Sequence, residues 1–173
     1  ETIEDIYTQS YVIPFLFPML ENAGANVLMP RERDWNTVEL IADRDMPGSG
    51  YSEHGVWSDA PGTGFKDAKD EYLDGDNPFA MGGARMTHGA GNGKHICSAA
   101  WTPDFPSNGR YAVYVSYVTV SNSTASARYE VRHSGGSTLF SVNQRMGGGT
   151  WIYLGTFRFD IGADADQGVY LTN

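Results

Sequence analysis

From residue 94 to its end, the chain consists of short segments in which apolar and polar residues alternate, separated by turn residues. In "ARYEVRHSG", Tyr129 and Val131 alternate with Glu130 and Arg132, which predicts a strand with one buried and one exposed face. The similar segments "STLFSVNQ", "TWIYLGTFRF" and "QGVYLTN" follow at short spacing. Many short strands joined by turns predict a mainly β protein, an antiparallel β-sandwich of the jelly-roll type.

Two further segments belong to this strand-rich part. "KHICSAAWTPD" predicts a strand that ends before Pro103, with Cys97 as a small core residue. "GRYAVYVSYVTV" carries apolar residues on both faces, which predicts a central strand of the sandwich. The single cysteine cannot form an internal disulfide, so it leaves the redox compartment open.

The preceding part of the chain has a different pattern. Residues 1–45 predict a short helix–strand fragment of an α/β domain, in which the helix ends at Gly24 and "ANVLMP" forms a buried strand. Residues 46–93 are rich in Gly, Pro and Asp, and predict surface loops with one or two short strands. We therefore assign residues 46–173 to the sandwich.

Composition excludes some classes of partner. The formal net charge is −9, and a surface of this sign repels the phosphates of nucleic acids. No apolar run in the sequence is long enough to cross a bilayer as a helix. Hydrophobic residues make up 40% of the 173 residues, which is enough for a packed core.

Three long contiguous strings resemble the golvesin C-terminal-like module: "WTPD", "YAVYVSY" and "GGGTWIYLGTF", within a similarity that extends roughly from Gly50 to Asn173. The resemblance implies a β-sandwich attached to secreted bacterial enzymes of the xanthan lyase kind. It also implies a carbohydrate-binding role, with a polysaccharide or peptidoglycan glycan as partner beside the remainder of the parent enzyme. The expected location is secreted, periplasmic or on the cell surface. The family's sandwich usually closes with a strand beyond Asn173.

The segment "LENAGANVLMPRERD" resembles the helix–strand element of zinc-dependent N-acetylmuramoyl-L-alanine amidases. The matching residues are Leu20, Gly24, Ala25, Val27, Arg33 and Asp34. The resemblance implies that Glu4, with Asp5 as the one-residue alternative, is a zinc ligand in a longer parent. It also leaves an alternative function open. The chain would then be the non-catalytic portion of an amidase-like hydrolase, and the sandwich a structural or protein-contact insertion.

Three consecutive glycines, 147–149, precede Trp151 directly and indicate a turn that needs positive φ or a close approach. The amides of Asn143 and Gln144 lie just before this turn, and amides beside aromatic rings are typical of sugar sites. The alternative is that Trp151 is a core residue packed against Trp101. By strand alternation Tyr153 is expected to share the face of Trp151. The candidate carbohydrate-binding residues are therefore Trp101, Asn143, Gln144, Trp151 and Tyr153.

The sequence predicts no metal or catalytic centre within this chain. None of the four histidines, His54, His88, His95 and His133, has a partner at zinc-ligand spacing. "DEYLDGDNP" contains part of a calcium-loop pattern, but a solvated acidic turn is the favoured interpretation. We therefore expect no enzymatic activity from this chain alone, no cofactor in it, and zinc only in a longer parent.

Overall fold

A computed structural model describes residues 39–67, 76–89 and 96–173. The helix–strand fragment expected before residue 39, including Glu4, lies outside these residues, as do Asp70, Glu71 and Asp74 of the acidic loop. The described strands are β1 (Tyr51–His54), β2 (Ser58–Asp59), β3 (Arg85–Met86), β4 (Ser98–Trp101), β5 (Gly109–Val115), β6 (Ala127–His133), β7 (Gly136–Val142), β8 (Ile152–Phe159) and β9 (Gly168–Thr172), with one short 3-10 helix, η1 (Pro78–Ala80).

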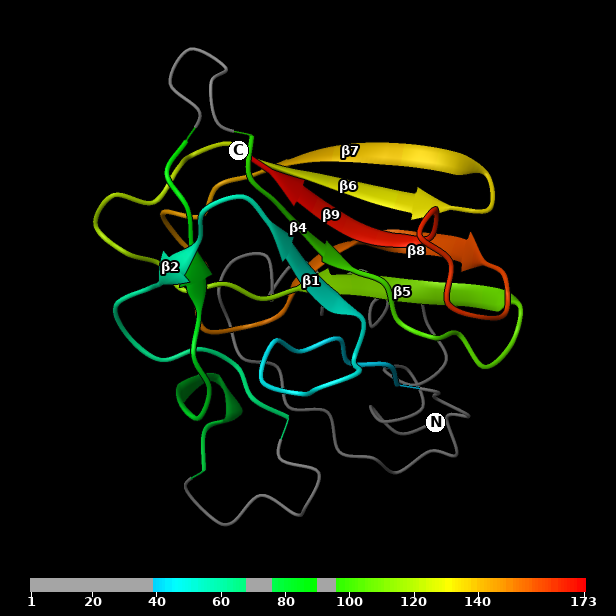
Figure 1. Ribbon diagram of the computed structural model, residues 1–173, viewed down its shortest axis with the longest axis horizontal. Coiled ribbons are helices and arrows are strands. Elements are labelled where there is room, and N and C mark those ends of the chain that lie inside the picture. Colours follow the sequence, from blue (N-terminus) through cyan, green and yellow to red (C-terminus); the bar gives the residue numbers. More distant parts are fainter. Residues whose placement is uncertain (1–38, 68–75, 90–95) are drawn as a thin grey trace, which may run out of the picture.

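The strands form an antiparallel sandwich, which confirms the predicted fold class. Five strands pair in the order β1-β4-β9-β6-β7, and Figure 1 shows them side by side with β8 and β5 beneath. Strands β5 and β8 pair with each other to form the second layer, while β2 and β3 form a small separate ladder. The last strand, β9, lies in the middle of the large sheet between β4 and β6.

The hydrophobic core lies between the two layers. Tyr129 and Val131 of β6 enter it, as the alternation predicted, whereas Glu130 and Arg132 on the other face are half-buried. Phe159 of β8 is 1% exposed, and its ring stacks on Phe105 with the centroids 4.4 Å apart. The remaining buried members of this core are Val115, Ala127, Ile152, Leu154 and Val169. Burying these apolar faces against each other holds the two sheets together.

Cys97 is buried, as predicted for a small core residue. Its backbone N–H donates to the side-chain oxygen of Asn173 at 2.7 Å, and its sulfur accepts from the N–H of Val56 at 3.3 Å. These contacts connect the start of β4 to the end of β9 and to the loop after β1. Within the described ranges, no helix has the length and apolar character needed to cross a membrane.

Two expectations about strands are wrong. Strand β5 pairs only with β8 among the described residues, and its Arg110, Ala112 and Tyr114 are exposed, so it is not a central strand with two buried faces. The expectation arose because Ala112 and Tyr114 are apolar. An apolar residue in a strand does not show by itself whether another layer covers it. The described residues of the region 46–93 form three short strands instead of one or two, and β1 belongs to the large sheet through its pairing with β4.

Candidate functional site

The turn before Trp151 uses its three glycines for two different reasons. Gly147 and Gly149 have φ of +75° and +77°, a left-handed conformation that favours glycine. Gly148 lacks a positive φ, but a Cβ placed on it would lie 2.4 Å from the backbone nitrogen of Thr119. The glycine run therefore meets both of the requirements that the sequence indicated, at different positions.

The loop that carries these glycines is fixed onto the segment that follows β5. The N–H of Gly149 donates to the carbonyl oxygen of Tyr117 at 3.0 Å, and the N–H of Gly148 donates to the Thr119 hydroxyl at 3.1 Å. The Tyr117 hydroxyl donates in turn to the carbonyl oxygen of Met146 at 2.7 Å. Burial raises the pKa of the Tyr117 hydroxyl. The loop from β7 to Trp151 is consequently hydrogen-bonded to both the backbone and the side chains of the segment 117–119.

Trp151 is half-buried and packs against two aromatic rings. Its ring centroid lies 4.6 Å from that of Phe65 and 5.7 Å from that of Phe79. The expected contact with Trp101 is wrong, because Trp101 contacts Tyr51 at 5.4 Å and Tyr129 at 6.5 Å. Trp101 ends β4 in the large sheet, whereas Trp151 precedes β8 in the other layer. Phe65 and Phe79 come from the Gly- and Pro-rich region, where the sequence has no periodicity that marks them as partners.

A run of polar and aromatic contacts connects Trp101 to Gln144. The Gln144 side-chain nitrogen donates to the hydroxyl of Tyr129 at 3.0 Å, and Tyr129 contacts the ring of Trp101. Tyr129 is 2% exposed, and this burial raises the pKa of its hydroxyl. The backbone carbonyl oxygen of Gln144 accepts from the Thr119 hydroxyl at 2.9 Å, so Gln144 also anchors the glycine loop.

Asn143 and Tyr153 lie in different surroundings. Asn143 is exposed, and its side-chain oxygen accepts from the N–H of Arg145 at 3.1 Å. Ile152 and Leu154 are buried in the core, so Tyr153 between them lies on the opposite face of β8. There its ring is 5.2 Å from the ring of Tyr114.

Three of the five candidate residues line the same cavity. Trp101, Gln144 and Trp151 border a cavity of about 1110 Å³ that Trp57 and Tyr117 also line. Asn143 and Tyr153 are not among its lining residues. Two indole rings and one amide thus border the same cavity, which also has residues from both faces of β5 in its lining, and the other two candidates lie elsewhere.

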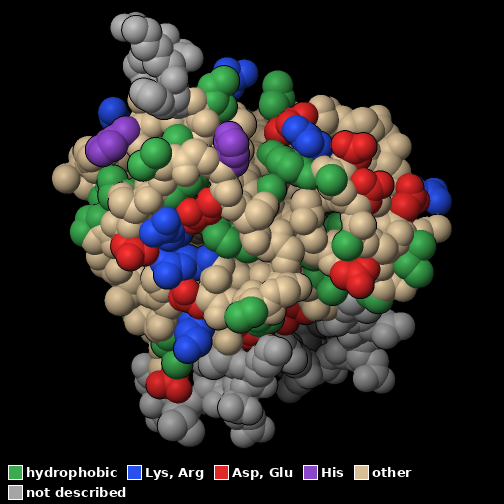
Figure 2. Space-filling model, viewed as in Figure 1, with side chains coloured by type: hydrophobic (Ala, Val, Ile, Leu, Met, Phe, Trp, Pro, Cys, Tyr) green, Lys and Arg blue, Asp and Glu red, His purple; other side chains and the backbone are tan. Residues whose placement is uncertain are grey.

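The same cavity borders a cluster of charged residues that the sequence did not indicate. Arg85 forms two hydrogen bonds to the carboxylate of Glu53, at 2.7 and 3.0 Å, and a third to Asp59 at 2.9 Å. Arg44 also contacts Asp59, at 3.1 Å. In Figure 2, charged side chains of both signs lie mixed over the region of β2 and β3. Glu53 and Arg85 are 32 residues apart, so no local spacing in the sequence could have paired them.

These contacts change the pKa of the groups involved. The hydrogen bond from Arg85 is the main reason that the pKa of Glu53 lies below its ordinary value. Arg85 likewise lowers the pKa of Asp59. Burial, and then the neighbouring Glu53 carboxylate, raise the pKa of the Tyr51 hydroxyl, which donates to Glu53 at 2.6 Å. The Glu53 carboxylate therefore stays ionised and is occupied by partners within the chain.

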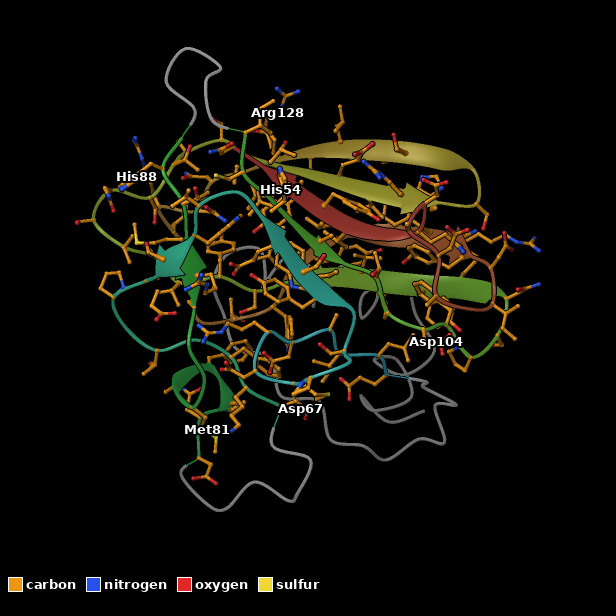
Figure 3. The ribbon with its side chains drawn as sticks, viewed as in Figure 1. His54, Asp67, Met81, His88, Asp104 and Arg128 are labelled. Carbon is orange, nitrogen blue, oxygen red and sulfur yellow. The ribbon has the colours of Figure 1, made fainter. Side chains whose placement is uncertain are left out.

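A second, smaller cavity of about 320 Å³ is lined by carboxylates, among them Asp67 and Asp104, which both lie below β1 in Figure 3. Asp67 contributes its backbone N–H to the buried carboxylate of Asp43 at 3.1 Å. In the described part of the chain, no group of three His, Cys, Asp or Glu side chains is arranged to hold a metal ion. The proposed zinc position, Glu4, lies outside these residues.

Comparison with known proteins identifies relatives of the chain. Over 81 residues it is 36% identical to the xanthan lyase of Bacillus sp. (strain GL1), a match that spans 47% of this chain and 9% of that enzyme. It also matches the solved structure of a Paenibacillus xanthan lyase with a TM-score of 0.51 and 26% identity, over 75% of this chain and 12% of the other. The chain thus corresponds to a small part of these relatives.

The golvesin C-terminal domain model matches residues 76–173, more than half of the chain. The matched residues contain β4 to β9, and hence four of the five strands of the large sheet together with the β5–β8 layer. They also contain Trp101, Gln144 and Trp151. The chain belongs to the golvesin C-terminal domain family.

Proposed function

We propose that this chain is a carbohydrate-binding module of a larger, secreted or cell-surface enzyme that acts on polysaccharide. The observation that carries the proposal is that Trp101, Gln144 and Trp151 line one cavity with Trp57 and Tyr117. Flat aromatic faces stack on the C–H faces of sugar rings, and amide and hydroxyl groups can hydrogen-bond sugar hydroxyls. The two similar enzymes are both xanthan lyases, which favours a polysaccharide over other ligands.

Rigidity of the site supports the same proposal. The loop that leads to Trp151 is fixed through Gly148 and Gly149 to the segment 117–119, and the Trp151 ring is held by Phe65 and Phe79. An aromatic platform that is ordered before the ligand arrives loses little conformational entropy on binding. A rigid loop is therefore better suited to stacking a sugar than a flexible one.

Calorimetric titration of the 173-residue chain with xanthan oligosaccharides and with peptidoglycan glycan fragments tests the proposal. We expect binding of the xanthan fragments, weakened about tenfold or more in Trp151→Ala because the stacking surface is lost. Trp151→Phe keeps an aromatic ring between Phe65 and Phe79, and should bind with intermediate affinity. Met146→Ala is the matched control, since Met146 lies in the same loop, is 59% exposed and does not line the cavity. Failure of all these glycans to bind, or equal affinity of Trp151→Ala and the parent chain, would contradict the proposal.

A further inference from the structure

The outer face of the β5–β8 sheet carries two arginines directly opposite each other. Arg110 of β5 and Arg158 of β8 are register partners, and both are exposed. Their neighbours Tyr111 and Phe159 contribute to the core, so the arginines lie on the face turned away from it. Like charges directly opposite on adjacent strands destabilise a sheet. The arginine pair therefore does not stabilise the sheet by itself.

Neither arginine has an anionic partner in the described part of the chain. No carboxylate there lies within 4.0 Å of either guanidinium, and neither side chain forms a hydrogen bond to a described residue. The chain as a whole has 21 acidic residues and 12 lysines and arginines, so carboxylates are plentiful. Arg44 and Arg85 are each paired with two carboxylates, and Arg132 with one. The β5–β8 face is thus a local cationic site on an acidic protein.

The same face carries an aromatic pair at its other end. Tyr114 and Tyr153 are register partners, and their rings lie 5.2 Å apart. Between the two pairs lie Ala112 and Thr156, which are exposed and small. Four residues of strand separate Arg110 from Tyr114, which is roughly 13 Å at the usual rise per residue. The strip that results is cationic at one end and aromatic at the other; a β-bulge lies between Val113 and Tyr114, and the two tyrosine rings are tilted by 46° to each other.

We propose that this strip binds an acidic oligosaccharide, with the sugar carboxylate between Arg110 and Arg158 and a neighbouring sugar ring on the tyrosine pair. Guanidinium groups bind carboxylates through paired, charge-assisted hydrogen bonds, and an anion between the two arginines removes their mutual repulsion. The inference rests on the proposed function and specifies its ligand class. Trp151 of the proposed carbohydrate site directly precedes β8, and Tyr153 of the strip follows Trp151 by two residues.

The test compares oligogalacturonate with the same oligomer after reduction of its carboxyl groups, each titrated calorimetrically into the chain. Wild type should bind the acidic oligomer more tightly. Arg110→Gln and Arg158→Gln should each weaken that binding about tenfold or more, and leave the reduced oligomer unaffected. Tyr153→Ala should weaken both oligomers by a similar factor. Lys66→Gln is the matched control, because Lys66 is an exposed cation that belongs neither to the strip nor to the lining of the large cavity, whereas Arg128, labelled in Figure 3, lines that cavity.

Several outcomes would overturn the inference. An equal loss in Lys66→Gln would show attraction by overall charge alone. Equal binding of the acidic and reduced oligomers, unchanged in both arginine variants, would remove the acidic specificity while leaving carbohydrate binding intact. Arginine-dependent binding of a polyglutamate peptide with the same affinity would show that the strip recognises carboxylates of proteins. Absence of binding by every glycan, including those tested with Trp151→Ala, would refute the proposed function as well. Since the two arginines repel each other, both glutamine variants should unfold at or above the melting temperature of the wild type.

Discussion

At the scale of single residues, the glycine run before Trp151 shows that neighbouring glycines can be required for unrelated reasons. Gly147 and Gly149 adopt positive φ, whereas Gly148 makes room for the backbone of Thr119. The sequence pattern alone suggests a common reason for all three. The distinction matters for substitutions, because a methyl group at Gly148 meets backbone atoms that cannot rotate away.

We predict that Gly148→Ala destabilises the chain by about 1–3 kcal/mol through this overpacking. Gly89→Ala is the matched control, since a Cβ there meets nothing within 4 Å and its φ is not in the positive range. Free energies of unfolding from urea titrations of the two variants give the comparison. Similar values for both would mean that the glycine loop moves away from Thr119 at little cost.

At the scale of elements, one side chain connects the small β2–β3 ladder to the large sheet. Arg85 of β3 binds Glu53 of β1 and Asp59 of β2, and thereby joins the β2–β3 ladder to the large sheet, to which hydrogen-bonded strand pairing does not connect it. The Glu53 side chain is 20% exposed, so water screens its contact with Arg85 only partly. The connection is therefore electrostatic and depends on the ionisation of a carboxylate.

This connection predicts a pH dependence of stability. The pKa of Glu53 is lower in the folded than in the unfolded chain, so its contribution is complete above the unfolded pKa and is lost as the pH falls through the folded one. Glu53→Gln should cost about 1 kcal/mol at pH 7, and the difference from wild type should shrink below about pH 4. Unfolding titrations at pH 7 and pH 3 measure it. Asp104→Asn is the control because it removes an exposed carboxylate, and its effect on stability should not differ between pH 7 and pH 3. An effect of Glu53→Gln that is equal at both pH values would argue against the ionic connection.

At the scale of the whole molecule, the two sheets depend on one shared core. Phe159 of β8 and Phe105, which follows β4, stack in its interior, and Tyr129 and Val131 of β6 belong to the same cluster. Because neither layer has a second apolar cluster among the buried residues of the described part, the layers should unfold together.

Phe159→Ala should accordingly lower the free energy of unfolding by about 3–5 kcal/mol, through lost burial and the cavity that remains. Ile161→Ala, two residues further on and 65% exposed, should change it by no more than about 0.5 kcal/mol. Far- and near-ultraviolet circular dichroism during urea unfolding report on strands and on aromatic packing. Separate midpoints for the two signals would show a populated intermediate and contradict unfolding of the two layers in one step.

The sequence by itself determined the strands that are half-buried. Alternation predicted β6 because Tyr129 and Val131 enter the core while Glu130 and Arg132 lie on the other face, and the same period located β7, β8 and β9. It determined the turn at Gly147–Gly149 too, since positive φ and close approach both select glycine. These are local requirements, which a residue meets or fails to meet whatever the remote neighbours are.

Only the tertiary structure decided which segments face each other. Trp151 packs against Phe65 and Phe79, whereas the expected partner was Trp101. The tertiary structure also gave β5 an exposed face and paired Glu53 with Arg85. It also set Arg110 opposite Arg158 and Tyr114 opposite Tyr153, although each pair is separated by about forty residues or more in the sequence. Apolar and charged side chains carry no information about the identity of their remote partners. Strand order and register supply it, because they bring together residues that the sequence keeps apart.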